Sequence, residues 1–210
     1  MGQLVMILGK SGSGKSASLR NFKPGEAGIF NVAGKRLPFQ SELKTITNRS
    51  YSDISATIAA NGKRCYVIDD STYLMAFDNF DKATEKGYDK FTNMAVSFYK
   101  LLDAARNTDD DTITYFILHP EYNPDNTEKV RTIGKMLDEK LCIEGLFPIV
   151  LDCVSEPVEG GKVRHVFITE SNGMNLAKAP IGMFEPVIDN DLKAVDTRIR
   201  EYWGMKPIKE

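Results

Sequence analysis

The chain has few of the residues that signal a secreted or a metal-stabilised protein. Its 210 residues include only 3 cysteines, which are widely separated, with no CxxC pair and no His/Cys cluster at zinc-site spacing. Cys65 and Cys153 lie in apolar, strand-like runs, where a reduced thiol behaves as a small hydrophobic residue. We therefore expect no disulfide framework and no structural zinc, and a reducing cytosol as the setting.

Long hydrophobic segments are also lacking. No run approaches the roughly 18 apolar residues that a membrane-spanning helix needs. The amino terminus enters an apolar strand directly, with no basic region, apolar core or cleavage site of a secretory signal. We predict a soluble cytoplasmic protein with no membrane partner.

The chain also lacks a strong net charge. Its 27 basic and 29 acidic residues give a formal net charge of -2, so any contact with nucleic acid must come from a local patch. The 42% hydrophobic content is sufficient to fill the core of a domain of this length. With no repeat and no low-complexity tract, we expect one α/β domain over residues 1–210.

The most informative stretch is GKSGSGKS at residues 9–16, which is the complete P-loop pattern. An apolar run at 4–8, suited to a buried strand, precedes it, and residues 17–20 can continue as a helix. The alternative is a chance turn rich in glycine and serine. Four fixed residues in register at a strand-to-helix junction disfavour that alternative.

The spacing of this stretch suits the chemistry of a triphosphate. Gly9 and Gly14 allow backbone conformations in which successive N–H groups form an anion nest, and a helix beginning near Gly14 adds its free N–H groups. Lys15 would reach the β- and γ-phosphates, and the Ser16 hydroxyl would ligate Mg²⁺. The predicted ligands are ATP and Mg²⁺. The predicted nucleotide-binding residues are Gly9, Lys10, Ser11, Gly12, Ser13, Gly14, Lys15, Ser16 and Ala17.

A second apolar run, at residues 64–70, ends in two acids in the manner of a Walker B strand. Asp69 is predicted to hold Mg²⁺ together with Ser16. Asp70, the second acid at the same strand end, would orient or deprotonate the attacking water. The alternative for Asp70, weighted equally, is a helix cap for residues 71–75.

The rest of the chain predicts further layers of the same domain. Residues 88–107 carry one apolar stripe typical of a helix that packs on a sheet, and residues 112–118 form a strand that ends at His119. His119 is placed to sense the γ-phosphate, with a structural hydrogen bond as the alternative. Residues 148–154 and 163–168 form an antiparallel pair joined by a tight turn, and residues 191–203 form the last helix.

Three loops have polar or basic character. Residues 121–131 and 171–178 are polar, and we expect the first to be a mobile loop. The loop at 34–39 carries Lys35 and Arg36, which could contact nucleotide, nucleic acid or a neighbouring subunit. Exposed basic loops are usually only solvated surface, and we favour that interpretation here.

The order of these motifs resembles the RecA-type core, in particular the small phage-encoded ATPases of recombination and annealing systems. The segments that carry the resemblance are GKSGSGKS at 9–16, NVAGKRLPF at 31–39, YVIDD at 66–70, FILHPE at 116–121 and ITESNGMNLAKAPIGMFEP at 168–186. The resemblance implies a RecA-like three-layer sandwich with a mostly parallel sheet and an antiparallel C-terminal extension. It also implies a homo-oligomer with ATP between protomers, located in the host cytoplasm if the chain is phage-encoded.

The resemblance further implies roles for particular residues and partners. Lys178 matches the position of a cation that reaches the neighbouring protomer's nucleotide and stabilises the transferring phosphoryl group. The two polar loops would face single-stranded DNA, and a single-strand-binding or annealing protein would be a partner. The predicted catalytic residues are Lys15, Asp70, His119 and Lys178.

Two features depart from the family pattern. The acid expected just after the second strand is absent from residues 33–36, which makes Asp70 the candidate acid. The two polar loops are not basic, so DNA affinity should be weak per protomer and depend on assembly. The leading hypothesis is therefore an ATPase coupled to single-stranded DNA. The alternatives are a small-molecule or nucleotide kinase and a non-hydrolysing nucleotide-binding adaptor.

Overall fold

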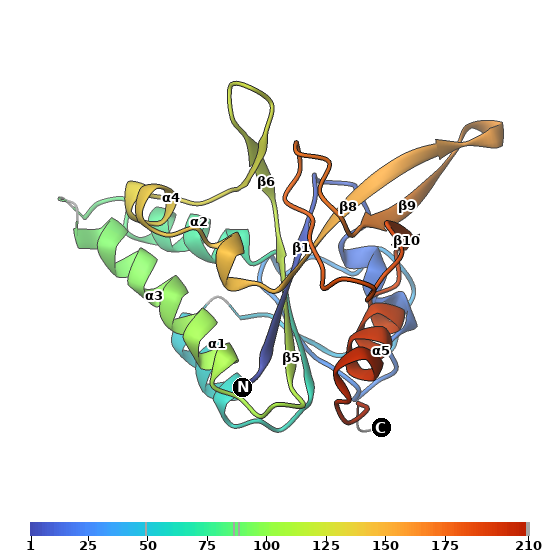
Figure 1. Ribbon diagram of the computed structural model, residues 1–210. Helices are drawn as coiled ribbons and strands as arrows, with labels where there is room; N and C mark the ends of the chain where they lie inside the picture. The colour runs from blue at the N-terminus through green and yellow to red at the C-terminus, as the bar shows by residue number, and fades with distance from the viewer. Residues whose placement is uncertain (49, 86, 88, 209–210) are drawn as a thin grey trace.

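A computed structural model, which describes residues 1–48, 50–85, 87 and 89–208, shows an eight-stranded sheet. The strand order is β10-β9-β8-β1-β5-β4-β2-β3. Figure 1 labels β10, β9, β8, β1 and β5 of this sheet. Strands β3, β2, β4, β5, β1 and β8 are parallel to one another, and β9 and β10 continue the sheet in antiparallel pairing. The strands are β1 (Gln3–Leu8), β2 (Gly28–Asn31), β3 (Thr45–Ile46), β4 (Cys65–Asp69), β5 (Ile113–Leu118), β8 (Ile149–Val158), β9 (Lys162–Ile168) and β10 (Val187–Asp189).

The central strands are apolar along their whole length because both faces of the sheet are covered. Side chains of β1 alternate between two core clusters: Met6 and Leu8 pack in one, and Val5 and Ile7 in the other. A strand buried on both faces needs such a continuous apolar run. The predicted α/β class, with a mostly parallel sheet and an antiparallel C-terminal extension, is confirmed.

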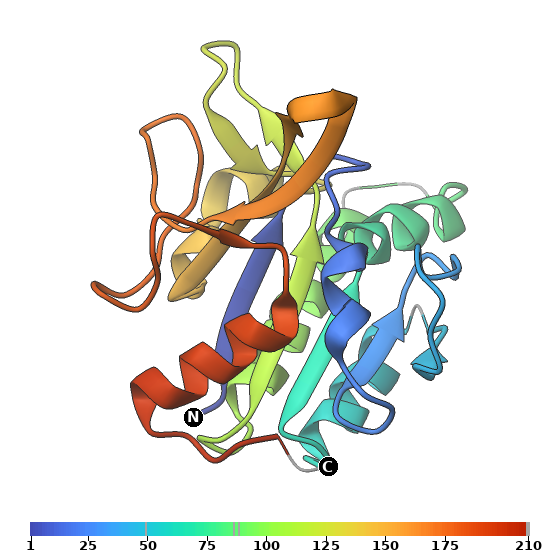
Figure 2. The same cartoon turned by 90° about the vertical axis from the view of Figure 1, so that its right-hand side faces the viewer.

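Helices cover both faces of this sheet, as a three-layer sandwich requires. On one face lie α1 (Tyr51–Ala59), α2 (Thr72–Asp81), α3 (Asp89–Arg106) and α4 (Lys135–Lys140), and on the other lie the 3-10 helix η1 (Ser16–Asn21) and α5 (Leu192–Trp203) (Figures 1 and 2). Two further 3-10 turns are η2 (Glu144–Leu146) and η3 (Glu159–Gly161). No helix within the described ranges has the length and apolarity to cross a membrane.

The predicted helices are largely confirmed. The apolar stripe of α3 is buried as expected, through Met94, Ala95, Phe98, Leu101, Leu102 and Ala105. Its predicted first residue, Tyr88, lies outside the described residues. Helix α5 begins where predicted because the carboxylate of Asp191 accepts hydrogen bonds from the backbone N–H groups of Lys193 and Ala194.

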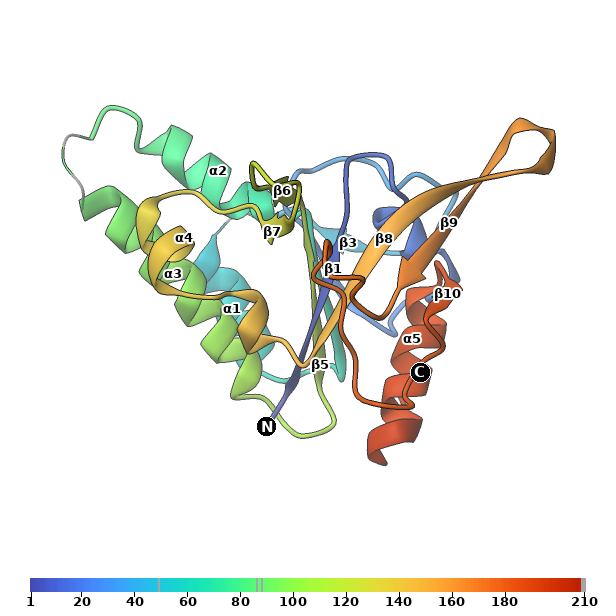
Figure 3. The same ribbon diagram turned by 45° about the horizontal axis from the view of Figure 1, so that its top comes forward.

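Two hairpins project from the carboxyl edge of the sheet. Strands β8 and β9 form a long ribbon whose turn lies at residues 159–161, where Gly160 adopts a φ of 78°, and this hairpin was predicted. The second hairpin is a correction, because the segment predicted as a mobile loop forms strands β6 (Pro120–Tyr122) and β7 (Glu128–Val130). Figure 3 shows β6 and β7 beside the carboxyl end of β1.

Candidate functional site

The P-loop follows β1, and its glycines occupy positions where a side chain would be strained or would clash. Gly12 and Gly14 have φ angles of 82° and 99°, in the left-handed region that side chains with a Cβ rarely adopt. Gly9 is required for close packing, because a Cβ there would lie 2.6 Å from the carbonyl oxygen of Cys153. The predicted conformational role of glycine is therefore confirmed at Gly14, whereas Gly9 is needed for close packing rather than for its backbone conformation.

The helix after the loop differs from the prediction. A helix beginning near Gly14 was expected, whereas the structure has the six-residue 3-10 helix η1 beginning at Ser16. The backbone N–H of Ser18 closes its first turn by donating to the carbonyl of Lys15 at 3.2 Å, and it also contacts the carbonyl of Gly14 at 3.1 Å. A segment this short has a small macrodipole, so the loop's own N–H groups and Lys15 must supply most of the attraction for an anion.

Lys15 is buried at the centre of the loop. Its Nζ donates to the carbonyl oxygens of Gly9 at 2.7 Å and of Lys10 at 2.9 Å. Burial lowers the pKa of this ammonium group, although Cys153, Asp70 and Asp69 oppose that shift. The ammonium is thus held inside the loop, within reach of any phosphate that the loop binds.

Ser16 and Asp69 meet although 53 residues separate them in the sequence, with Ser16 Oγ donating to Asp69 Oδ1 at 3.0 Å. Two oxygens at adjacent corners of an octahedral Mg²⁺ site, each about 2.1 Å from the metal, lie about 3.0 Å apart. Burial, followed by the neighbouring charge of Asp70, raises the pKa of Asp69 to about 6. A buried carboxylate beside a second acid and a hydroxyl fits a divalent cation, so these residues fit the predicted ion.

No group of three or more His, Cys, Asp or Glu side chains within the described ranges could hold a metal by itself. An ion held by Ser16 and Asp69 would need further oxygen ligands. Mg²⁺ keeps several waters and commonly takes phosphate oxygens as ligands, so the observed pair suits an ion that arrives with a nucleotide.

Asp70 forms a second cluster at the end of β4. Its Oδ2 pairs with Lys35 Nζ at 2.6 Å, and its Oδ1 lies 3.3 Å from His119 Nε2. Burial alone raises the pKa of Asp70, but hydrogen bonds from His119 and Lys35 outweigh it and leave the pKa below its usual value. The structure thus brings the predicted residues Asp70 and His119 together, and adds Lys35.

The two clusters share one cavity of about 400 Å³ above the carboxyl edge of the sheet. The lining residues are Ser11, Gly12, Gly14, Lys15, Ser16, Ala17, Lys35, Arg36, Pro38, Asp69, Asp70, His119 and His165. Lys35 and Arg36 are exposed as expected, and both line this cavity. The interpretation as only solvated surface falls short for Lys35, which pairs with Asp70. The sequence could not show this, since the path of the 34–39 loop depends on tertiary packing.

His165 is a cavity residue that sequence reasoning missed. It lies on β9, and its ring packs so closely on Gly14 that a Cβ there would be 2.6 Å from the ring's Cγ atom. Its Nδ1 is 3.0 Å from Ser155 Oγ, its partner across the β8–β9 ribbon. Only the register of that ribbon turns His165 towards the P-loop, and the sequence carries no separate signal for it.

Two predicted site residues point away from the cavity. Lys178 Nζ donates to the carbonyl of Glu144 at 2.8 Å, and the Lys178 backbone forms an antiparallel bridge with Val150. Lys10 Nζ lies 4.7 Å from the centre of the Tyr122 ring on the β6–β7 hairpin. Neither side chain reaches the phosphate cavity of its own chain in this structure.

A second cavity, of about 520 Å³, adjoins the first. The two share Ser11 and His119. Its lining residues are Lys10, Ser11, Thr72, Tyr73, Ala76, His119, Pro120, Arg131, Thr132 and Ile133. It therefore extends from the P-loop towards the β6–β7 hairpin and α2.

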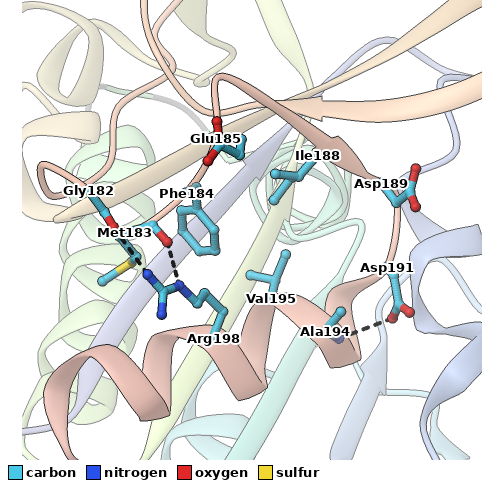
Figure 4. Close-up of a pocket in the computed structure, with 10 residues that line it drawn as sticks. All are labelled: Gly182, Met183, Phe184, Glu185, Ile188, Asp189, Asp191, Ala194, Val195 and Arg198. Carbon is cyan, nitrogen blue, oxygen red and sulfur yellow. Dashed lines mark hydrogen bonds between the residues drawn. The ribbon is translucent and has the colours of Figure 1, made fainter.

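A third cavity, of about 470 Å³, lies between α5 and the segment before it (Figure 4). Its lining residues are Gly182, Met183, Phe184, Glu185, Ile188, Asp189, Asp191, Ala194, Val195 and Arg198. The Arg198 guanidinium is already bonded to the carbonyls of Gly182 and Met183. The cavity includes no residue of the P-loop, so it is separate from the candidate site.

Neither a protein-family model nor a curated protein matches the sequence. Among solved structures, the Legionella pneumophila ATPase DotB matches with a TM-score of 0.40 and 10% identity, over 79% of this chain and 45% of DotB. The pilus retraction motor PilT, solved with bound ADP, matches with a TM-score of 0.40 and 13% identity, over 96% of this chain and 51% of PilT. The chain thus spans about half the length of the structures it matches. These likenesses are too distant to bear on function.

Proposed function

We propose that this chain binds ATP with Mg²⁺ at the P-loop and hydrolyses it. The observation that carries the proposal is the 3.0 Å contact between Ser16 Oγ and Asp69 Oδ1. It joins the end of the phosphate loop to the acid of a separate strand, in a cavity that also contains Lys15. A chance turn rich in glycine and serine has no reason to meet a buried acid in this way.

Each residue would have a distinct task. The loop N–H groups and Lys15 bind the phosphates, and Ser16 with Asp69 holds the ion. Mg²⁺, when bound, neutralises charge on the β- and γ-phosphate oxygens. Asp70, 3.3 Å from His119 and at the same strand end as Asp69, is the group that orients water and accepts its proton.

The test is ATP binding by calorimetry and phosphate release by the purified chain, compared with Lys15→Ala. We expect Lys15→Ala to lose binding and turnover by at least about 100-fold, because the buried ammonium is removed from the centre of the loop. Lys100→Ala, an exposed change on the far helix α3, serves as the control. Turnover that survives Lys15→Ala would contradict the proposal.

We further propose that hydrolysis is coupled to single-stranded DNA in a recombination or annealing system, as the resemblance implies. What supports coupling is that the two polar loops contact each other and the P-loop. The backbone N–H of Glu128 donates to the carbonyl of Met174 at 2.7 Å, and Lys10 lies over the Tyr122 ring. Single-stranded DNA should therefore raise ATP turnover, whereas equal turnover with and without DNA would contradict coupling.

The homo-oligomer with ATP between protomers, and Lys178 acting in the neighbouring site, belong to the same proposal. If they are correct, Lys178→Ala protomers mixed with Lys15→Ala protomers recover turnover, because each supplies the group that the other lacks. Inactivity of every mixture that nonetheless assembles, measured by light scattering with a nucleotide analogue, would contradict the trans role.

The second cavity favours one alternative function, that of a kinase. It adjoins the phosphate cavity through Ser11 and His119 and has room for a small acceptor molecule. Arg131 and Lys10 on its wall suit an anionic acceptor. Transfer of the γ-phosphate to a nucleoside, a nucleotide or a small alcohol, in place of release as phosphate, would establish this function. Tight ATP binding with neither outcome would instead indicate a non-hydrolysing adaptor.

A further inference from the structure

We propose that Lys35 is a catalytic cation of this chain's own nucleotide site, whose ammonium group leaves Asp70 and binds the terminal phosphate. The inference rests on the proposed nucleotide binding and adds a residue to it. A cation that stabilises the transferring phosphoryl group would then be supplied in cis, by the loop after β2, in addition to the Lys178 proposed to act in the neighbouring site.

The backbone at Lys35 is anchored beside the acids. The carbonyl of Lys35 accepts a hydrogen bond from the side-chain amide of Asn31, the last residue of β2. Asn31 is buried and lies opposite Asp69 in the parallel pairing of β2 with β4. Gly34, with a φ of 66°, makes the turn that connects them. The loop thus holds the Lys35 backbone at the carboxyl edge of the sheet.

The two partners of the Lys35–Asp70 ion pair differ in freedom. The Asp70 side chain is 5% exposed, and the residues after it are fastened to β5, since Ser71 N donates to the carbonyl of Ile117 at 2.8 Å. The Lys35 side chain is 63% exposed, and its long stem places Nζ 5.6 Å from the centre of the Tyr73 ring. When a phosphate competes with Asp70 for the ammonium group, Lys35 is the partner that can move.

The charges of the cavity favour that movement. Asp69 and Asp70 lie side by side at the end of β4, so a triphosphate entering the loop meets two carboxylates as well as Lys15. A second cation between the acids and the phosphate reduces this repulsion. Lys35 lines the cavity, whereas Lys178 is bonded to Glu144 outside it.

Movement of Lys35 would also free a carboxylate oxygen for the reaction. Asp70 Oδ2 is occupied by the Lys35 ammonium at 2.6 Å in this structure, and it can accept a hydrogen bond from water once that ammonium leaves. In the step itself, the water oxygen bonds to the γ-phosphorus and its proton passes to Asp70. The bond between the γ-phosphorus and the bridging oxygen breaks, and its electron pair stays on the β-phosphate, beside Lys15 and the Ser16–Asp69 pair that would hold Mg²⁺.

The experiment compares the affinities for ADP and for a non-hydrolysable ATP analogue, both with Mg²⁺, so that binding of the terminal phosphate is isolated. In Lys35→Met, which keeps the stem and removes the charge, we expect the analogue to bind about 10-fold more weakly or worse, with ADP within about two-fold of wild type. Lys35→Arg should restore most of the preference for the analogue. Lys44→Met, an exposed change on the same loop, is the matched control.

The outcomes separate this inference from the proposed function. If wild type binds both nucleotides and Lys35→Met leaves their affinity ratio unchanged, Lys35 is only a structural partner of Asp70 and the inference is overturned. An equal loss for both nucleotides would overturn it in the same way. If wild type binds neither nucleotide, the proposed function fails, whatever Lys35 does. A thermal unfolding curve for each variant confirms that the folded protein is being compared.

Discussion

The candidate site has two halves that are built in different ways. The P-loop half is made by consecutive residues, with glycine torsions and the carbonyl contacts of Lys15 fixing its shape. The other half is assembled from three separate segments, in which Lys35, Asp70 and His119 meet. The first half is set by local sequence and the second by the order of the strands.

This difference indicates which part of the site can change its contacts when a nucleotide binds. The contacts of the P-loop half are buried and mostly use the backbone, so it is suited to bind without rearrangement. The assembled half contains one exposed, flexible side chain paired with a buried acid, so it is suited to respond to what is bound. We therefore expect changes in the first half to abolish binding of ADP and ATP alike. Changes in the second half should retain ADP binding and should reduce turnover or, at Lys35, binding of the terminal phosphate.

The largest effect should come from Asp69→Asn, which removes the acid that links the two halves. We expect turnover to fall by about 1000-fold, and affinity for ATP with Mg²⁺ to fall to the value measured with a chelator, because an amide holds the ion poorly. Thermal stability should not fall, since the buried negative charge is removed as well. ATP binding that still responds to Mg²⁺ would remove Asp69 from the site.

Asp70→Asn should show most clearly that the assembled half affects turnover and the P-loop half affects binding. Turnover should fall by about 100-fold, the usual contribution of a general base, while ATP affinity stays within a few-fold of wild type. Single-turnover phosphate release and equilibrium binding measure the two quantities independently. Normal turnover would show that Asp70 is only a structural partner of Lys35 and His119. The alternative of a helix cap is wrong, because Ser71 is the N-cap of α2 and the Asp70 carboxylate contacts Lys35 and His119 instead.

A smaller effect is expected for His119→Asn, because the imidazole contacts Asp70 at 3.3 Å and would act with it rather than alone. We expect about a 10-fold loss of turnover, in line with removal of one hydrogen bond to a charged group. Combined with Asp70→Asn, the change should cost little more than Asp70→Asn alone. Additive losses would show that His119 has a separate role.

The smallest effect concerns stability rather than turnover. Asp152 is buried near the P-loop, and burial, followed by the charge of Glu128, raises its pKa to about 7. Because the folded state holds this proton more tightly than the unfolded state does, the free energy of unfolding falls as pH rises from about 4 to 7. Asp152→Asn should remove this contribution, so the gain in stability relative to wild type should be larger at pH 8 than at pH 5. Urea unfolding at pH 5 and pH 8 measures the free energy of unfolding of the variant and of wild type. An equal difference between the two proteins at both pH values would contradict the prediction.

The same division explains what the sequence could predict. The P-loop, the acid pair of β4 and the sheet class follow from local patterns: a glycine spacing, an apolar strand ending in acids, and alternating strands and helices. Lys35 and His165 were misjudged or missed because their approach to the P-loop depends on loop path and strand register. The β6–β7 hairpin was missed for a related reason, since its short strands are polar and pair across a turn at residues 123–127.

The central claim is tested most directly by titrating the wild-type chain with ATP in a calorimeter, once with Mg²⁺ and once with a chelator. The account predicts saturable binding of one ATP per chain, weakened markedly by the chelator and lost in Lys15→Ala. Absence of binding at millimolar ATP with Mg²⁺, or binding that neither the chelator nor Lys15→Ala alters, would contradict it.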